Sequence, residues 1–492
     1  MDVREVRTEV QSGRLSVEQL LEMFEQQQRT IQRLLTEVTR LRERLAQYEP
    51  EVRREGGGGG PAGETPSAQY SLVAEERRRH GRRRRKKSPG RRRTELKFAE
   101  AQRFQDIYPP GVRPVDARLV RERAVWRLEE GRAVLVGYRV FCGPDGREPR
   151  IPGVTPRCEY GLEILVVLAF LVYVVGISLD KACAVLAFFC QLSLSKSEAD
   201  ALLRQLARHW EAEYETLCDL LTRAAVVYLD ETGWKVGRAG CSLWTFATEL
   251  QRVFLFGCHK DSQTLDQMLP PDVFQGIGVS VDAAVYRHRF WGAQKCWAHL
   301  LRKAIRFALL YPRKKTYQRF LDQLLALYSD AKRIAADQRL GPATRSARVA
   351  DLEARLCDLC QPLWRDPTPQ MRPPERDFAN LVNELLQRMM DQELFTFVLV
   401  PGVESTNNLT ERLQRGPAQD RKIGRTSKSA AGAHRRSVIF SVLESLRANL
   451  EEFTLASVLA ESRRWMAEGV SLFQKQWRAL TGALPPVAPD TG

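Results

Sequence analysis

Three acidic residues occupy positions from which carboxylates could bind metal ions. Asp230 and Asp282 each end an apolar run, in VVYLD and VSVD, and Glu411 lies in TNNLTERLQR at residues 406–415. A carboxylate at the end of a buried strand is costly unless positive charge offsets it. Hard divalent cations prefer oxygen ligands, and two of them about 4 Å apart can activate water and stabilise a leaving oxygen. The pattern indicates a candidate site for phosphoryl transfer.

Each acid also has an ordinary interpretation. Aspartates end many strands for turn reasons, so spacing alone leaves catalysis as one alternative. Glu231 is expected on the opposite face of the strand from Asp230 and is the weaker ligand. Arg415 follows Glu411 at i+4, the spacing of a surface ion pair on a helix. Arg415 could therefore neutralise Glu411 in the free protein and release it to metal when a further ligand binds.

The elements that must position these acids are strands and helices in one α/β unit. Four β-rich runs, AAVVYLDETGWKV, CSLWTFATE, RVFLFGCHKD and GIGVSVD, predict strands from Ala224 to Asp282. Helical spacing resumes in CWAHLLRKAIRFALL and continues to Leu363, then restarts in LVNELLQRMM. A helical segment is therefore expected to separate the aspartates from Glu411.

Helices are also expected before the strands. The run at residues 164–179 is 16 residues without charge, shorter than the roughly 20 needed to cross a bilayer, so a buried core helix is expected and no membrane contact. A helix from Asp180 to Cys190 and a second one opened by Ser195, with Glu198 in a capping box, have a helix-turn-helix shape. DNA reading and ordinary helix packing both remain open for this pair.

The first 50 residues carry a heptad pattern. Seam residues alternate in steps of four and three, which predicts a coiled coil that pairs with another copy or a partner. A glycine-rich stretch at residues 56–67 then predicts a flexible tether. The seam residues are Leu20, Phe24, Gln27, Ile31, Leu34, Val38, Leu41, Leu45 and Tyr48.

Positive charge is concentrated in two segments. The net charge is +16, of which residues 77–93 contribute +12 and residues 412–436 contribute +7, so the rest is close to neutral. Concentrated cations favour a polyanion such as DNA, against the alternatives of a solubilising tail and a solvated helix face. The DNA-binding candidates are Arg82, Arg83, Arg84, Arg85, Arg412, Arg415, Arg421, Lys422, Arg425 and Lys428.

The ten cysteines are scattered without regular pairing, and no secretory signal opens the chain. A reducing, cytoplasmic location is expected, associated with the nucleoid when DNA is bound. Cys357 and Cys360 lack a second pair at ligand spacing and are interpreted as helix packing. A hairpin is expected in AVLVGYRVFCGPDGREPR, with its turn at Gly143 to Gly146.

Four blocks resemble the DDE transposases of the insertion sequence 66 family. They are YLDETGWKV, VSVDAAVYRH, QKCWAHLLRKA, and TNNLTERLQR followed by DRKIGRTSKSAAGAHRRSVIFSVLESLR, and the resemblance covers residues 161–459. It implies a ribonuclease-H-like core in which Asp230, Asp282 and Glu411 form the catalytic, metal-binding triad. The implied cofactor is a pair of Mg²⁺ ions, with Mn²⁺ as a substitute.

The resemblance also implies the activity and the roles of neighbouring residues. Such an enzyme binds the terminal inverted repeats of an insertion sequence, cleaves phosphodiester bonds with water and joins the 3′ ends to target DNA. The aspartates would share one ion, and Glu411 would complete the second ion's shell. In CWAH, His299 would contact a DNA phosphate or the outer shell of a metal, or make a structural hydrogen bond. Asn407 and Asn408 would orient the helix of Glu411 or touch the DNA backbone.

One departure from the family concerns zinc. Relatives commonly carry a cysteine-rich zinc module, but Cys142 and Cys158 are the cysteines in that interval here, so no structural zinc is predicted. The expected partners are DNA, further copies of the chain and accessory transposition proteins. Two alternatives remain: a DNA-binding regulator or inactive relative without turnover, and a nuclease of the same core fold.

The expected class is α/β: a ribonuclease-H-like core interrupted by a helical insertion, preceded by a helical region and an N-terminal coiled coil. The expected segments are a coiled-coil helix (1–50), a linker and basic arm (51–93), a small hairpin region (94–160), a helical region that is a candidate for reading DNA (161–223), the first segment of the core (224–310), the helical insertion (311–400), the second segment of the core, with the helix of Glu411 (401–450), and a helical tail (451–492).

Overall fold

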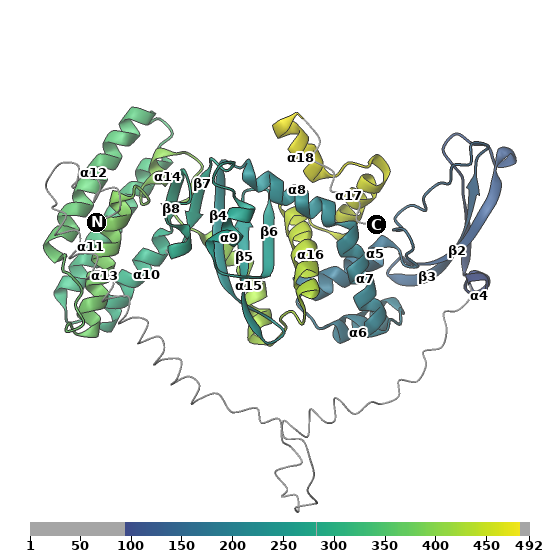
Figure 1. Ribbon diagram of the computed structural model, residues 1–492, viewed down its shortest axis with the longest axis horizontal. Helices are drawn as coiled ribbons and strands as arrows, with labels where there is room; N and C mark the ends of the chain where they lie inside the picture. Colours follow the sequence, from purple (N-terminus) through teal and green to yellow (C-terminus); the bar gives the residue numbers. More distant parts are fainter. Residues whose placement is uncertain (1–93, 282, 483–492) are drawn as a thin grey trace, which may run out of the picture. The chain divides into compact units, whose positions relative to one another are not determined.

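The computed structural model describes residues 94–281 and 283–482. The predicted coiled coil, the glycine-rich linker, the basic arm with Arg82 to Arg85, and Asp282 lie outside the described residues. The described chain combines many helices with two mixed sheets (Figure 1), so the predicted α/β class is confirmed. Within these residues no helix is both long and apolar enough to span a bilayer.

A five-stranded sheet forms the centre of the fold, in the order β6-β5-β4-β7-β8. Only β5 runs antiparallel to the other strands of this sheet. The parallel strands β7 and β8 therefore end at the same side of the sheet, and Ser280 at the end of β7 pairs with Leu229 of β4. The four predicted strands are confirmed; β8 was not predicted, because GAQK has neither apolar alternation nor β-branched residues. The strands are β4 (Val226–Val236), β5 (Ala239–Ala247), β6 (Arg252–Cys258), β7 (Ile277–Ser280) and β8 (Gly292–Lys295).

Helix α16 (Ala430–Asn449) covers the outer edge of this sheet, beside β6 (Figure 1). Three of its serines recur every fourth residue, on one helix face, and their hydroxyl oxygens accept backbone N–H groups that the edge strand would otherwise leave unpaired. The edge is thereby closed to further strand pairing. The bonds, each 2.9 Å, join Ser437 to Phe256, Ser441 to Phe254 and Ser445 to Arg252.

Helices α5 (Leu162–Ala169), α6 (Leu179–Cys190) and α7 (Lys196–His209) precede the sheet. The predicted core helix over residues 164–179 is buried mainly at residues 164–169. It also ends early, because α5 passes into a π-helical turn that stops before Gly176, whose φ is +73°. Ser195 accepts the Glu198 N–H as predicted, but the Glu198 carboxylate binds the Tyr160 hydroxyl at 2.5 Å instead of closing a capping box. Together with α16 and the sheet, these helices enclose one hydrophobic core.

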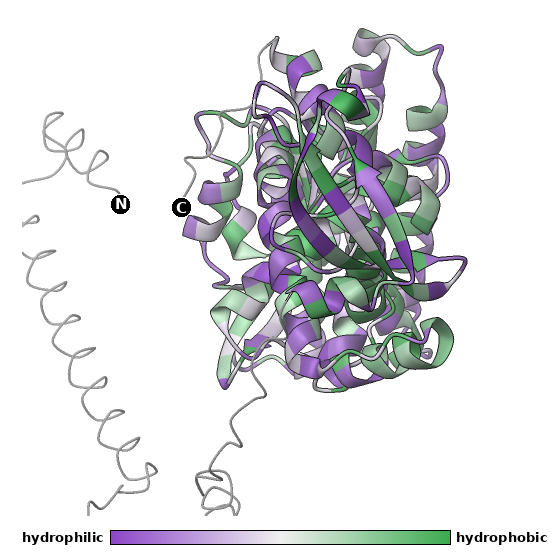
Figure 2. Cartoon of the chain, turned by 90° about the vertical axis from the view of Figure 1, so that its right-hand side faces the viewer, coloured by the Kyte–Doolittle hydropathy of each residue, from purple (hydrophilic) through white to green (hydrophobic). Residues whose placement is uncertain are grey.

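A small sheet of order β1-β3-β2 lies near the start of the described chain, after α4 (Thr94–Ala99). The chain turns at Gly143 to Gly146, where the Gly146 N–H donates to the Gly143 carbonyl at 3.0 Å, but no strand follows this turn. The hairpin instead turns at Glu130 and Gly131, with φ of +48° and +80°. Positive φ at both turn residues matches the twist of the flanking strands. Figure 2 looks onto these strands, which carry hydrophilic as well as hydrophobic residues. They are β1 (Arg103–Ile107), β2 (Arg118–Glu129) and β3 (Arg132–Cys142).

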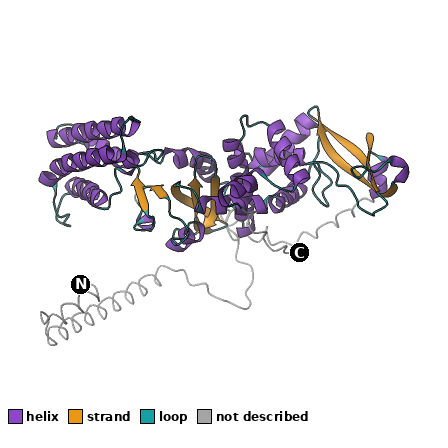
Figure 3. Ribbon diagram, turned by 90° about the horizontal axis from the view of Figure 1, so that it is seen from above, coloured by secondary structure: helices purple, strands orange, loops and turns teal. Residues whose placement is uncertain are grey.

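The helical insertion follows β8 and packs around a second hydrophobic core, which also includes Tyr228, Ile277 and Val279 of the sheet. Figure 3 shows these helices gathered at the left of the view, next to the strands of the five-stranded sheet. Cys360 is fully buried in this core, which agrees with the packing role expected for it. The insertion contains α11 (Lys315–Ala336), α12 (Pro342–Cys360), α13 (Pro373–Met390) and α14 (Thr396–Leu399), and α10 (Trp297–Leu310), which precedes it, packs against α11 and α13.

Five further helices of the described chain lie before, within and after the segments that form the central sheet. Helix α15 (Asn408–Lys422) contacts β4 and β5. The others are α8 (Glu211–Thr222), α9 (Ser262–Met268), α17 (Leu455–Glu468) and α18 (Leu472–Thr481).

Candidate functional site

Asn407 fixes the start of α15 against the sheet. Its side chain is fully buried, and Nδ2 donates to the carbonyl of Leu229 at 2.6 Å. Its backbone N–H donates to Sγ of Cys296 at 3.2 Å. Because Leu229 immediately precedes Asp230, and Glu411 lies one helical turn after Asn407, this contact directs Glu411 towards Asp230.

Asp230 lies in an acid-rich environment. Burial raises its pKa from the ordinary 3.8 to about 7, and the negative charges of Glu231 and Glu411 act in the same direction. A hydrogen bond of 2.9 Å from the Glu231 N–H to Oδ1, and the nearby charge of Lys260, only partly oppose this. The carboxylates of Asp230 and Glu411 are thus close enough to repel each other, and the cluster favours an added cation.

The structure brings two of the three predicted ligands together and does not describe the third. Ser280, two residues before Asp282 in the chain, pairs with Leu229 across the parallel strands β7 and β4. Asp282 itself lies outside the described residues. The metal-binding triad therefore stays a prediction.

Among the described residues, the cation that pairs with Glu411 is Arg302. Its Nη2 lies 3.0 Å from both carboxylate oxygens. The predicted partner, Arg415, is exposed and forms no ion pair within the described chain. The helix packing explains this difference, because α10 carries Arg302 across the face of α15 that bears Glu411, where Nη2 is shared between the two carboxylate oxygens.

Cys296 and His299 lie at the start of α10, beside Glu411. Burial raises the pKa of the Cys296 thiol. Burial and the charge of Arg302 lower the pKa of His299, so its imidazole is neutral at pH 7. Sγ of Cys296, a ring nitrogen of His299 and a carboxylate oxygen of Glu411 all lie within 4.8 Å of one another.

Glu231 is occupied by structural partners. Its carboxylate accepts the hydroxyl of the fully buried Tyr286 and pairs with Lys260. These contacts agree with its expected place as the weaker ligand. They also tie the segment after β7 to the residue next to Asp230.

The predicted DNA-binding residues of the described chain take different positions. Arg421 donates from Nη1 to Thr232 Oγ1 at 2.9 Å and to the carbonyl of Gly233 at 2.8 Å, so it braces β4. Arg425 and Lys428 line a cavity of about 780 Å³ that also reaches the first residues of α7 and α16. The others, Arg412, Arg415 and Lys422, are exposed on α15.

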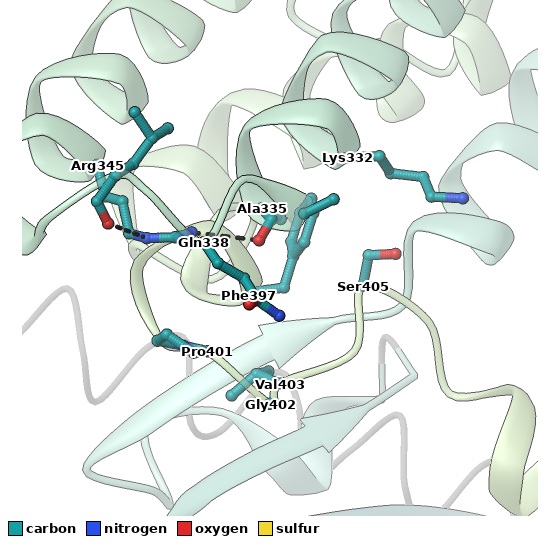
Figure 4. Close-up of a pocket in the computed structure, with 11 residues that line it drawn as sticks. Lys332, Ala335, Gln338, Arg345, Phe397, Pro401, Gly402, Val403 and Ser405 are labelled. Carbon is teal, nitrogen blue, oxygen red and sulfur yellow. Dashed lines mark hydrogen bonds between the residues drawn. The ribbon is translucent and has the colours of Figure 1, made fainter.

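A separate cavity of about 540 Å³ lies within the helical insertion (Figure 4). Arg345 lines it, but its guanidinium is taken up by backbone carbonyls, among them those of Leu340 at 3.1 Å and Asp337 at 2.7 Å. These carbonyls follow the end of α11, where a cation offsets the helix dipole. Arg345 is therefore a structural residue.

A family model of the IS66 transposases matches residues 157–435. The chain belongs to this family. The matched range includes the five-stranded sheet, the helical insertion and α15. Membership implies a function in transposition and DNA as a partner. No curated protein matches the sequence.

Two residues of the site in this IS66-family transposase were not singled out in the sequence. Arg302 has a local signal, because it follows His299 at i+3 and must share its helix face. Tyr286 had no signal, since its bond to Glu231 joins residues 55 positions apart.

We expect Asp230→Asn to stabilise the fold in a pH-dependent way. The wild-type carboxyl has a pKa of about 7 when folded against 3.8 as the reference, so wild-type stability falls as pH rises between these values and levels off above pH 7. Asparagine removes this loss, and its advantage should grow from near zero at pH 4 to about 4 kcal/mol at pH 8. Urea unfolding at several pH values measures it; an advantage independent of pH would contradict the assignment.

We expect Asn407→Ala to destabilise the fold by about 1–3 kcal/mol, because it leaves the buried Leu229 carbonyl without its donor. Asn408→Ala, at the adjacent exposed position, is the matched control and should change stability by less than about 0.5 kcal/mol. Chemical denaturation measures the free energy of unfolding of both variants. Equal losses of stability would contradict the anchoring role of Asn407.

Proposed function

We propose that the chain is a metal-dependent DNA transposase with a ribonuclease-H-like core. It cleaves phosphodiester bonds at the terminal inverted repeats of its element and joins the 3′ ends to target DNA. The observation that carries the proposal is the approach of Asp230 and Glu411 at one edge of the central sheet, in a member of a transposase family. The strand order, with one antiparallel strand in second place, supports the proposed core.

The proposed ligands of two Mg²⁺ ions are Asp230, Asp282 and Glu411. The described pair fits such ions, because both offer carboxylate oxygens and the raised pKa of Asp230 reflects a cluster short of positive charge. Bound Mg²⁺ would supply activation of the nucleophile and stabilisation of the leaving oxygen. For these ions to bind, Asp230 would lose its proton to solvent and Glu411 would separate from Arg302.

One site can serve both proposed reactions. In cleavage, a water oxygen attacks the phosphorus, the bond to the 3′ oxygen breaks, and that oxygen leaves as a hydroxyl after taking a proton. In joining, this hydroxyl attacks a target phosphodiester and loses its proton while the target strand breaks. The two steps differ in the attacking oxygen alone, so the same acids can act in each.

DNA phosphates are the proposed ligands of the cavity between α7 and α16. Arg425 and Lys428 supply charge there, and the lining includes Ser197 in the first turn of α7 and Ser429, the residue before α16. Helix N-termini favour anions. The basic arm and the coiled coil of residues 1–93 are proposed to add DNA contacts and to pair chains.

We expect Glu411→Gln and Asp282→Ala to lose cleavage and joining of labelled element ends in Mg²⁺ by at least about 100-fold, because each removes a charged ligand. DNA binding should persist. Glu404→Gln, at an exposed acid in the loop before α15, is the matched control and should keep activity.

Gel analysis of nicked and joined products makes this measurement. If the wild type and the Asp282→Ala variant bind DNA equally and both give no product, the protein is the regulator or inactive relative instead.

We expect the double variant Arg425→Ala and Lys428→Ala to weaken DNA binding at all sequences. The slope of log affinity against log salt should become shallower by about 2, roughly one for each lost phosphate contact. Arg339→Ala removes an exposed cation in the helical insertion and should leave the slope unchanged. Fluorescence anisotropy over a salt series measures both, and identical slopes would exclude this cavity from the DNA interface.

A further inference from the structure

Cys296, His299 and Glu411 form a cluster of mixed sulfur, nitrogen and oxygen donors that the proposed Mg²⁺ chemistry does not use as a set. Cys296 is the residue immediately before α10, and its side chain is buried. His299 lies three residues later, in the first turn of this helix. Glu411 comes from α15, whose position is fixed by Asn407. Their donor atoms lie within 4.8 Å of one another.

His299 shows that this cluster is chemically incomplete. Its Nδ1 is buried and has no hydrogen-bond partner. The nearest acceptor, Oε1 of Glu411, lies 3.6 Å away, too far for a hydrogen bond. Nε2, by contrast, faces Nη1 of Arg302 at 3.4 Å. A buried imidazole nitrogen that lacks a partner and lies beside a carboxylate is typical of a metal ligand.

We propose that Cys296, His299 and Glu411 bind a thiophilic divalent cation of the Zn²⁺ class. Zn²⁺ accepts sulfur, nitrogen and oxygen donors together, whereas Mg²⁺ requires oxygen. Metal–ligand bonds of about 2.0–2.3 Å place tetrahedral donors about 3.3–3.8 Å apart. The side chains must therefore close in by roughly 1 Å. Three protein ligands leave the fourth position open to water or a phosphate oxygen.

Binding changes the partners of this cluster. The Cys296 thiol releases its proton to solvent, because the thiolate is the ligand. Arg302 leaves the carboxylate of Glu411 to the incoming cation. The backbone N–H of Asn407, which already donates to Sγ of Cys296, remains as an outer contact that orients the sulfur.

Occupancy would also inhibit strand cleavage, a consequence that rests on the proposed function. Glu411 cannot serve the Zn²⁺-class ion and the Mg²⁺ pair in the same geometry. Micromolar Zn²⁺ is therefore expected to reduce Mg²⁺-dependent cleavage at least tenfold in the wild type. The loss should be smaller in His299→Gln if that variant retains activity.

Titration of the full-length protein with Co²⁺ tests the site itself. Thiolate–Co²⁺ coordination gives a charge-transfer absorption band, expected at one ion per chain. Cys296→Ser should abolish the band, and His299→Gln should weaken Co²⁺ affinity at least tenfold. Cys357→Ser, on α12 away from the cluster, is the matched thiol control and should keep the band. Thermal melting verifies the fold of each variant, and His299→Gln decides the matter if Cys296→Ser does not fold.

Two results would overturn the proposal: no band in the wild type, or a band unchanged in both Cys296→Ser and His299→Gln. Asp230→Asn separates this proposal from the proposed function, since it should lose cleavage and keep the band. A wild-type protein that binds Co²⁺ through Cys296 but cuts no DNA would leave the metal site standing and refute the transposase chemistry.

Discussion

The hydrogen bond from the Asn407 amide to the Leu229 carbonyl is the contact on which the arrangement of the site depends. It joins a strand and a helix that are 178 residues apart in the chain. The same residue also donates its backbone N–H to Cys296, so three separate segments meet at one buried amide. A buried carbonyl needs a donor, and this need fixes α15 on the sheet more specifically than apolar packing could, because packing tolerates small shifts of register. This bond therefore determines the position of Glu411 on α15.

Several cationic and hydroxyl groups reduce the electrostatic repulsion among the acids at this end of the strands. Arg302 neutralises Glu411, while Lys260 and Tyr286 hold Glu231. Asp230 has no such cation of its own at bonding distance in the described chain, and its pKa of about 7 follows from this. A fold that optimised stability alone would replace such a group by a neutral one. Retaining it makes sense where the charge has a ligand to bind, and this connects the electrostatics of the site with its chemistry.

The sequence predicts those elements of the fold that depend on local pattern. The four longer strands carry β-branched and aromatic runs, and the approach of Asp230 to Glu411 agrees with the expected sheet edge and helix. Strand β8 exists because β7 and the loop before α14 supply its partners, and no local pattern marks it. The hairpin turn at Glu130 and Gly131 lacks an Asn-Gly or Asp-Gly signature. The stronger glycine pattern at residues 143–146 therefore led to a hairpin turn being predicted there instead. Arg302 replaces Arg415 through a contact between two helices, which spacing within one helix cannot predict.

The helical insertion can be long without disturbing the site because its entrance and exit are held together. Trp297, the first residue of α10, donates from its indole to the carbonyl of Leu394 at 2.7 Å and from its backbone N–H to the carbonyl of Ser405 at 3.0 Å. Close ends make the entropic cost of the intervening chain grow only slowly with its length. The hydrophobic core of the insertion also takes in Tyr228, Ile277 and Val279 of the sheet, so the insertion packs directly on the strands that lead to the site. Trp297 thus binds Ser405, which lies two residues before Asn407. Asn407 then makes the hydrogen bond to Leu229 of β4.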